Sequence, residues 1–249
     1  MQSRLLSACV AAVVASGFLA GSPRATAAYV LDNLNVPTPG TPYQITLLNA
    51  APTYTSPSDI ISAGVSRQIT VNVTAPVNPA FNAVSGTIGS GAFSLNTDDL
   101  TKANASITYT LTGSASNLTG TTGLSLQFIA LNAGNVTNTP LVVASNIPVT
   151  ITVVTSGGTK SLTTSISSLN PTFNFASFTG PGTLALGNVS SIRIALNGGA
   201  NSRFATDFSL DNVKVLPVPA PAGIVLGAIG FVGLLGGRAR SLRRKAVAA

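Results

Sequence analysis

The sequence predicts an all-β protein in which a single β-sandwich or jelly-roll ectodomain stands between an N-terminal signal peptide and one C-terminal transmembrane helix. Residues 29–216 are rich in threonine, serine, asparagine and valine with many glycines and prolines, which favours strands and turns over helices. Short runs of alternating apolar and polar residues recur in this segment. Uncharged apolar runs lie near both ends of the chain, each beside basic residues.

The first 28 residues have the layout of a secretory signal peptide. Arg4 gives a positive start, Leu5–Ala20 forms an apolar core, and Ala25-Thr26-Ala27 supplies small residues for cleavage, with Ala28 the next available end. The apolar run is short for a membrane span. We therefore expect export through the Sec machinery and a mature protein that begins near Tyr29.

Residues 29–216 are long enough for one domain with a sizeable core. Alternation is clear in Gln68–Thr74, whose three apolar side chains fall on one face. The same pattern recurs at Ala105–Thr112, Leu124–Ile129, Ile147–Val154, Pro171–Phe178 and Ser190–Leu196. This pattern is typical of antiparallel strands that cover a core on one side and face water on the other.

Turn residues separate these runs. Ser156–Gly158 stand between Val149–Val154 and Lys160–Ile166, which predicts a β-hairpin. Only Thr97–Ala103 has a helical pattern, and Thr97 is predicted to cap a single turn there.

Two stretches near the ends of the ectodomain, Tyr29–Val36 and Phe208–Val215, share the pattern aromatic-x-Leu-Asp-Asn-apolar-x-Val. In the second stretch the first two apolar residues and the last two have opposite parity. A regular strand cannot bury all four, so a bulge at Asp211-Asn212 is predicted. We expect both stretches to lie in the sandwich, close together. The second stretch resembles the last strand of jelly-roll domains of secreted bacterial proteins and carbohydrate-binding modules.

The net charge of +7 is carried by the ends of the chain. The leader holds Arg4 and Arg24, and five further basic residues lie in the tail. The ectodomain between them is neutral, because six basic residues balance six aspartates: Arg67, Lys102, Lys160, Arg193, Arg203 and Lys214 against Asp32, Asp59, Asp98, Asp99, Asp207 and Asp211. Nucleic-acid binding requires clustered positive charge, so no nucleic-acid partner is expected.

The residue types present argue against an enzyme. The chain has no histidine, glutamate or tryptophan, and its one cysteine, Cys9, lies in the leader. Ser-His-Asp catalysis, disulfides in the mature protein and Cys or His metal sites are thereby excluded. Glycoside hydrolysis needs two carboxyl groups at a defined separation, and Asp98-Asp99 are adjacent in a stretch that suits a solvated turn.

Calcium is a more plausible ligand than a substrate for catalysis, because it binds carboxylates, amide oxygens and backbone carbonyls. Asp32, Asp207, Asp211 and Asn212 are the candidate ligands if the two similar stretches meet. The alternative is that these side chains hydrogen-bond to backbone groups at bulges. The sequence leaves both open.

Aromatic residues for stacking on sugar rings are few. The tyrosines are Tyr29, Tyr43, Tyr54 and Tyr109. Tyr43 and Tyr54 lie in a proline- and threonine-rich region that leaves room for exposed rings, whereas Tyr109 alternates with apolar residues and is expected in the core.

The tail, residues 217–249, has three parts in a fixed order. A proline motif, Val218-Pro219-Ala220-Pro221-Ala222, leads into the uncharged segment 222–237, which is predicted to be a transmembrane helix. As a helix its 16 residues extend about 24 Å, short of the ~30 Å hydrocarbon core. The basic cluster 238–245 follows and is expected to hold the C-terminus in the cytoplasm. Its charged residues are Arg238, Arg240, Arg243, Arg244 and Lys245.

This order of motif, helix and basic cluster resembles the PEP-CTERM sorting domains of bacteria that make extracellular polysaccharide. The family's central glutamate is replaced by Ala220, so the motif resembles the variant group with Pro-small-Pro-Ala. The resemblance implies an exosortase-like processing enzyme as a partner. The alternative is an uncleaved tail anchor.

Together these features predict an exported, non-enzymatic surface or extracellular-matrix protein. Its C-terminal helix would anchor it in the inner membrane with the ectodomain outside the cytoplasm, and cleavage would release it to the cell surface or a polysaccharide matrix. The alternative function is a carbohydrate-binding module with a defined, calcium-assisted site.

Overall fold

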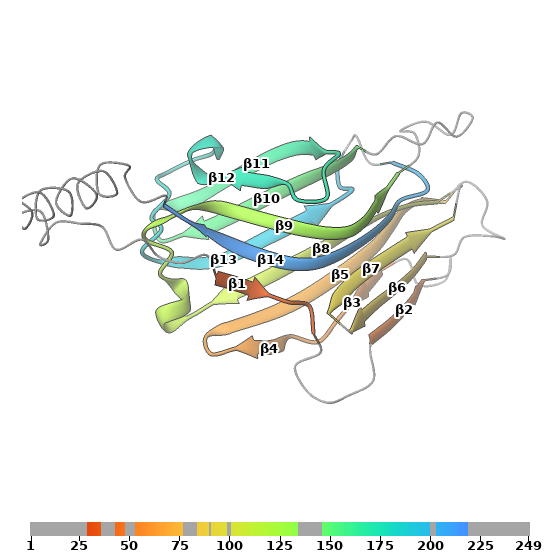
Figure 1. Cartoon of the computed structure of the whole chain (residues 1–249), viewed down its shortest axis with the longest axis horizontal. Helices are drawn as coiled ribbons and strands as arrows, with labels where there is room; N and C mark the ends of the chain where they lie inside the picture. Colours follow the sequence, from red (N-terminus) through yellow and green to blue (C-terminus); the bar gives the residue numbers. More distant parts are fainter. Residues whose placement is uncertain are drawn as a thin grey trace, which may run out of the picture. The chain divides into compact units, whose positions relative to one another are not determined.

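The computed structural model describes residues 29–35, 43–47, 53–76, 84–89, 91–98, 101–133, 146–199 and 203–218. In this part of the chain two seven-stranded sheets pack face to face as a β-sandwich (Figure 1). Residues 27–216 form one compact unit. The predicted all-β sandwich is therefore confirmed.

The first sheet has the strand order β12-β9-β14-β7-β6-β2, and β1 also pairs with β14. Its strands are β1 (Tyr29–Asp32), β2 (Tyr43–Leu47), β6 (Val84–Gly89), β7 (Ala92–Thr97), β9 (Thr121–Asn132), β12 (Thr172–Asn174) and β14 (Asp207–Pro217).

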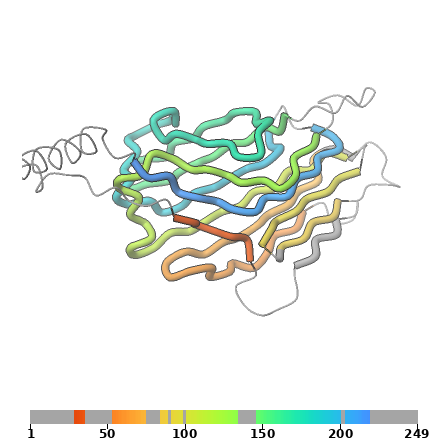
Figure 2. The backbone as a smooth tube through the Cα atoms, in the orientation of Figure 1, coloured from red at the N-terminus to blue at the C-terminus, as the bar shows by residue number. Residues whose placement is uncertain are grey.

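The second sheet has the order β11-β10-β13-β8-β5-β3, and β4 also pairs with β5. Its strands are β3 (Thr53–Thr55), β4 (Asp59–Ser62), β5 (Val65–Pro76), β8 (Thr101–Leu111), β10 (Ile147–Thr155), β11 (Gly158–Ile166) and β13 (Val189–Leu196). Two 3-10 turns, η1 (Gly113–Ser116) and η2 (Phe175–Ser177), are the helical elements of the described residues. The path of the chain between the sheets can be followed in Figure 2.

The core lies between the sheets and is built from the apolar positions of the alternating runs. On β8, Ile107 and Leu111 are buried, whereas Thr108 and Thr110, which alternate with them, face outward. On the first sheet the Phe208 ring meets Phe93 edge-on, with ring centroids 5.5 Å apart. Apolar side chains from both sheets are thus removed from water in one core, which stabilises the packing of the sheets. The period-two pattern predicts this burial.

The predicted hairpin is present between β10 and β11. Thr155 pairs with Gly158, so Ser156 and Gly157 form a two-residue loop. Gly158 has a φ of +140°, and a Cβ there would lie 2.6 Å from the carbonyl oxygen of Pro181. This position therefore requires glycine for both its backbone conformation and its packing.

The two similar stretches meet, as expected. β1 and β14 are antiparallel, with Tyr29 opposite Val215 and Val30 opposite Lys214. Phe208 and Leu210 are buried, and so are Val213 and Val215, because the phase of β14 changes at the Asp-Asn pair. The predicted change of face is confirmed. β14 pairs with β7 before it and with β1 after it.

The predicted helical turn at Thr97–Ala103 is wrong. Thr97 ends β7 and Thr101 begins β8, and the Thr101 N–H donates to the Asp98 carbonyl at 3.2 Å. The Thr97 hydroxyl caps no helix, because it accepts from the Thr206 N–H at 2.6 Å and ties β7 to the start of β14.

The strand predicted at Pro171–Phe178 is confirmed only in its first half. β12 ends at Asn174, whose side-chain oxygen accepts from the Ala176 N–H at 2.9 Å. This local bond starts η2 instead of continuing the strand, as asparagine side chains often do.

No helix among the described residues is both long and apolar enough to cross a membrane. The signal peptide 1–28, the transmembrane segment 222–237, the basic cluster 238–245 and the sorting motif beyond Val218 lie outside the described residues. They remain predictions.

The hairpin geometry makes a testable prediction. Gly158→Ala is expected to lower the free energy of unfolding by roughly 2 kcal/mol or more, because φ is nearly glycine-specific there and the new methyl group meets a carbonyl. Gly113→Ala is the matched control, since Gly113 also has a positive φ, +59°, but a Cβ there meets nothing within 4 Å. It is expected to cost about 1 kcal/mol. Equal losses in urea titrations would contradict the packing argument.

Candidate functional site

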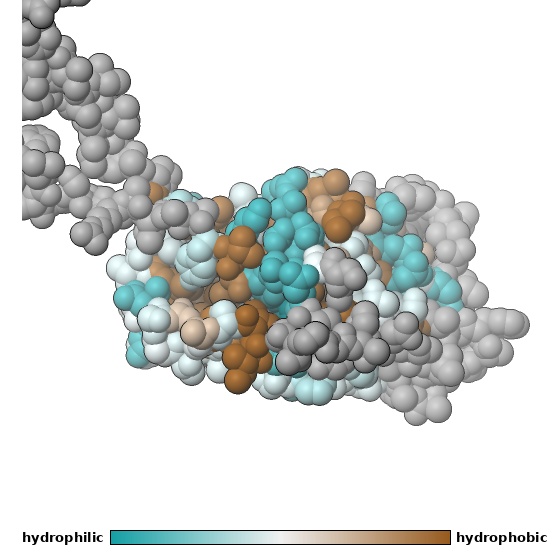
Figure 3. All heavy atoms as spheres, turned by 60° about the horizontal axis from the view of Figure 1, so that its bottom comes forward, coloured by the Kyte–Doolittle hydropathy of each residue, from teal (hydrophilic) through white to brown (hydrophobic). Residues whose placement is uncertain are grey.

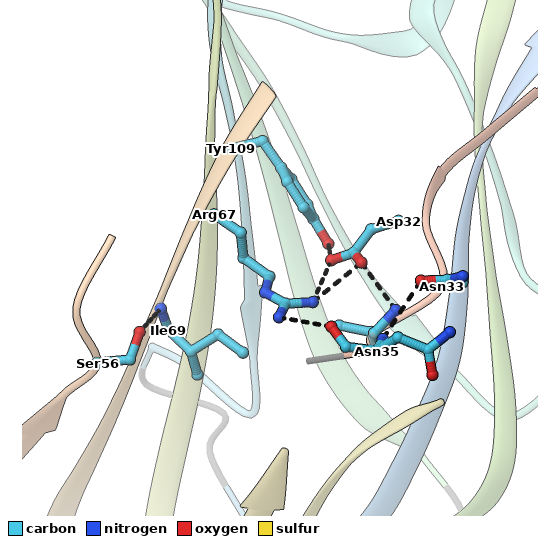
Figure 4. Close-up of polar contacts among 8 residues, drawn as sticks. Asp32, Asn33, Asn35, Ser56, Arg67, Ile69 and Tyr109 are labelled. Carbon is cyan, nitrogen blue, oxygen red and sulfur yellow. Dashed lines mark hydrogen bonds and ion pairs between the residues drawn. The ribbon is translucent and has the colours of Figure 1, made fainter. Parts of the chain in front are cut away.

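An ion pair joins the two sheets inside the sandwich (Figure 4). Asp32 ends β1 of the first sheet, and Arg67 lies on β5 of the second. Their charged groups are 2.9 Å apart, and each side chain is only 1% exposed. Charges removed from water to this degree are tolerated when they are paired and hydrogen-bonded.

Both oxygens of the Asp32 carboxylate accept hydrogen bonds from buried donors. The Arg67 Nη1 donates to both of its oxygens at 2.9 Å, and the Tyr109 hydroxyl donates to Oδ2 at 2.9 Å. The Leu34 N–H donates to Oδ1 at 2.7 Å, because the backbone turns back at Leu34 with a φ of +52°. That turn also brings the Asn35 carbonyl within 3.1 Å of Arg67 Nη2.

Tyr109 occupies the core position expected from the sequence, and its hydroxyl belongs to this polar network. Burial raises the pKa of Tyr109 well above its ordinary value, and the negative charge and hydrogen bond of Asp32 raise it further, while Arg67 opposes the shift. The phenol is therefore neutral at physiological pH and acts as a donor to Asp32.

The structure brings the two Asp-Asn stretches together but sends their carboxylates to different places. Asp32 lies between the sheets, whereas Asp211 and Asn212 are half-buried on the outer side of β14. Asn212 donates to Asp211 at 2.5 Å, and Lys214 donates to Gln127 at 2.8 Å. These polar groups bond to one another across β14 and β9.

Asp207, the remaining calcium candidate, accepts from the Thr97 backbone N–H at 3.1 Å. With Asp32 bonded to the Leu34 N–H, this contact matches the alternative in which these aspartates hydrogen-bond to backbone. Among the described residues no three His, Cys, Asp or Glu side chains are grouped to hold a metal ion. The donor set thus gives calcium no assembled site in this part of the chain.

A pocket of about 290 Å³ lies beside β1. It is bounded by β1, by the turn from β4 to β5, and by η1 with the residues that follow it. Its polar lining comes from Tyr29, Ser62, Ser114 and Asn117, and its apolar lining from Val30, Leu31, Ala63, Val65 and Ala115. In Figure 3 polar and apolar surface alternate on the face turned to the viewer.

The walls of the pocket are fixed by a close approach of two turns. Gly64, between β4 and β5, has a φ of +78°, and a Cβ there would lie 2.4 Å from the Thr112 carbonyl oxygen. The Thr112 N–H donates to the Gly64 carbonyl at 2.8 Å. The Asn117 side chain is held by its oxygen, which accepts from the Thr119 N–H at 3.0 Å.

Tyr29 places an aromatic ring at the rim of this pocket. Its residue is 39% exposed, and partial burial raises the pKa of its phenol. Of the other tyrosines, Tyr54 is half-buried on β3, and the side chain of Tyr43 lies outside the described part. Tyr29 is therefore the most exposed tyrosine side chain among those described.

Sequence reasoning missed both Arg67 and the pocket. Arg67 stood out only as one scattered basic residue in an alternating run, although a charge at an inward-facing position of a strand is the available signal. The pocket joins three segments that are far apart in sequence, and only two short runs of small residues, Ser62-Ala63-Gly64 and Gly113-Ser114-Ala115, mark its walls.

Comparison with known proteins finds no family model that matches the chain and no match among curated proteins. Several solved structures align over most of it. A family 11 carbohydrate-binding module from Clostridium thermocellum, in complex with a β-1,3-1,4-mixed-linked tetrasaccharide, is 14% identical and covers 78% of this chain and 98% of its own, with a TM-score of 0.36.

The family 11 module of a Clostridium thermocellum cellulosomal cellulase is 16% identical. The alignment covers 78% of this chain and 96% of that module, with a TM-score of 0.36. The module TmCBM61, in complex with β-1,4-galactotriose, is 12% identical, with 68% and 90% covered and a TM-score of 0.24. Superpositions this loose support no function, so we infer function from the side chains of this chain.

The buried pair predicts a large loss of stability when one partner is removed. Asp32→Ala leaves the Arg67 charge buried without a counter-ion and is expected to lower the free energy of unfolding by about 3–5 kcal/mol. The double variant Asp32→Ala/Arg67→Met is expected to recover much of that loss, because it removes both charges. Asp211→Asn, on the outer side of β14, is the control and is expected to change stability by less than ~0.5 kcal/mol. A single variant as stable as the control in urea titrations would contradict the role of the pair.

The raised pKa of Tyr109 predicts a loss of stability in alkali. The neutral phenol contributes fully below its unfolded-state pKa of about 10, and this contribution is lost as pH rises toward the higher folded-state pKa. The free energy of unfolding is therefore expected to fall above about pH 10. Tyr109→Phe is expected to cost about 1–3 kcal/mol at neutral pH and to flatten that fall. Equal alkaline slopes in the two proteins would contradict the assignment to Tyr109.

Proposed function

We propose that the sandwich is a non-catalytic carbohydrate-binding module of an exported protein, and that the pocket beside Tyr29 binds one ring of a neutral glycan. The observation that carries the proposal is the pocket itself, where an exposed aromatic ring meets small apolar side chains and hydroxyl and amide groups. This combination suits a sugar ring, which has apolar C–H faces and hydroxyl edges.

The size and charge of the pocket agree with this ligand. About 290 Å³ lies at the lower end of the range for small-molecule sites, roughly 300–1,000 Å³, so the pocket suits a single ring of a longer chain. None of its described lining residues is charged. A charged sugar would lose hydration there without gaining a counter-ion from any of these side chains, so the side chains of the pocket favour a neutral sugar.

The ends of the chain support delivery of this module to the cell surface. The leader Met1–Ala28 and the tail residues 217–249 carry the patterns of Sec export, of a sorting motif for an exosortase-like enzyme, and of an inner-membrane anchor. A surface protein of this kind meets extracellular polysaccharide as its natural partner. We propose no reaction, because the chain lacks histidine and glutamate.

Binding through the pocket is tested with the exported protein on a glycan array, followed by calorimetry with the neutral oligosaccharide that binds. Tyr29→Ala is expected to lower affinity at least ~5-fold, since it removes the stacking ring. Tyr29→Phe keeps the ring and is expected to change affinity less than ~3-fold. The control is Ile129→Ala, because Ile129 is 63% exposed on β9 and does not line the pocket.

A protein that binds no neutral glycan, or a Tyr29→Ala variant that binds as tightly as the Ile129→Ala control, would refute the pocket. Measuring the affinity again in the presence of EDTA distinguishes a calcium-assisted site, which would lose affinity, from one that needs no calcium. Affinity is expected to be unchanged, because the Asp32 carboxylate is bonded to Arg67 and Tyr109.

Processing of the ends is tested by mass spectrometry of both termini in cell and medium fractions. We expect an N-terminus near Tyr29 in both fractions and a C-terminus near the Val218–Ala222 motif in the medium. A C-terminus at Ala249 in every fraction would contradict cleavage of the tail and would support the alternative of an uncleaved tail anchor.

A further inference from the structure

Some of the charged side chains of the ectodomain lie on the strands with an outward direction, whereas Asp32 and Arg67 are buried between the sheets. On the first sheet, Asp207 and Asp211 point outward with Lys214, because they alternate with the buried residues of β14. On the second sheet, Arg193 points outward and is exposed, whereas Lys102 lies with its Nζ over the Phe204 ring, 4.6 Å from the ring centroid. The outward charge on the central strands of the second sheet is therefore Arg193, since Asp59 lies on the short strand β4 beside β5.

Outward side chains of the second sheet form straight rows across the strands. One row runs over β11, β10, β13, β8 and β5 as Ser161, Thr152, Arg193, Thr108 and Gln68. The next row is Thr163, Thr150, Ala195, Ser106, Thr70 and Thr55, in which Ser106 is buried among its neighbours. We call these two rows the hydroxyl face; no aspartate belongs to them.

The hydroxyl face is pre-ordered. Its strands pair without a register shift over these rows, so the backbones that carry neighbouring side chains are about 4.7–4.9 Å apart. Threonine side chains have little rotamer freedom because of their branched Cβ. The Thr150 and Thr163 hydroxyls lie 2.9 Å apart, and those of Thr55 and Thr70 lie 3.3 Å apart. Little conformational entropy remains to be lost when a ligand binds.

Arg193 is an exposed cation within the first row. Thr152 and Thr108 flank it on the adjacent strands. A guanidinium group recognises a carboxylate in a planar, two-point geometry. Hydroxyl groups on both sides can donate to and accept from the hydroxyls of a sugar.

We propose that the hydroxyl face binds an acidic polysaccharide, with Arg193 on a uronate carboxylate and the threonine rows on the sugar hydroxyls around it. This site lies on the second sheet, outside the residues that line the neutral pocket, and does not depend on it. An anionic lipid surface fits less well, because membrane attraction needs clusters of about four to eight basic residues, whereas the basic residue of the hydroxyl face is Arg193 alone.

The test measures binding of the exported protein to polygalacturonate and to a neutral β-glucan at low and moderate salt. Arg193→Gln is expected to lower affinity for polygalacturonate roughly 3- to 10-fold and to weaken its salt dependence. Affinity for the neutral glucan is expected to be unchanged. The pocket variant Tyr29→Ala is expected to show the reverse pattern, so failure of one site is distinguishable from failure of the other.

Lys214→Gln is the matched control, because it removes one positive charge from the opposite face. It is expected to leave binding to polygalacturonate unchanged. Thr108→Val/Thr152→Val keeps the shape and strand preference of both side chains and is expected to weaken binding without changing its salt dependence. Equal losses in the Arg193 and Lys214 variants would mean that net charge alone attracts the polymer and would overturn the site. Binding to phosphatidylglycerol vesicles as tight as to polygalacturonate would overturn the choice of ligand.

Discussion

The arrangement of this sandwich depends on a buried ion pair, in which Asp32 of the first sheet contacts Arg67 of the second. β1 has only four residues and pairs with the far half of β14. Hydrogen bonds of one short strand pair would hold it weakly. The Asp32 carboxylate, bound by Arg67 and Tyr109 of the second sheet, anchors its end inside the protein, because its departure would leave a buried arginine without a counter-ion.

That anchor also places the candidate binding pocket. Asp32 fixes the end of β1, so Tyr29 at its start lies opposite Val215 and reaches the space beside η1. The Gly64 turn and Thr112 supply the opposite wall at a separation that admits no side chain at position 64. A polar network whose charged side chains are almost fully buried thus determines where an exposed tyrosine lies.

The change of phase in β14 separates the polar groups of the two similar stretches. It lets Phe208 and Val213 both face the core, and it turns Asp211 and Asn212 outward together. The aspartate of the first stretch meanwhile turns inward to Arg67. The same sequence pattern therefore supplies a buried counter-ion in the first stretch and an outer polar cluster in the second. For this reason the candidate calcium ligands of the two stretches do not lie together.

The sequence by itself determined several of the strands, the hairpin at Ser156–Gly158 and the neutrality of the ectodomain, because alternation, turn residues and charge counts can be read along the chain. The meeting of the two similar stretches was predicted from their shared pattern and confirmed by the pairing of β1 with β14. Only the tertiary structure decided that Thr97 ends a strand, that Arg67 neutralises Asp32, and that Tyr29 meets Ser62 and Ser114 in one pocket. It also decided that Arg193 stands between two threonines. These contacts join residues distant in the chain, and strand register, which depends on packing between the sheets, selects them.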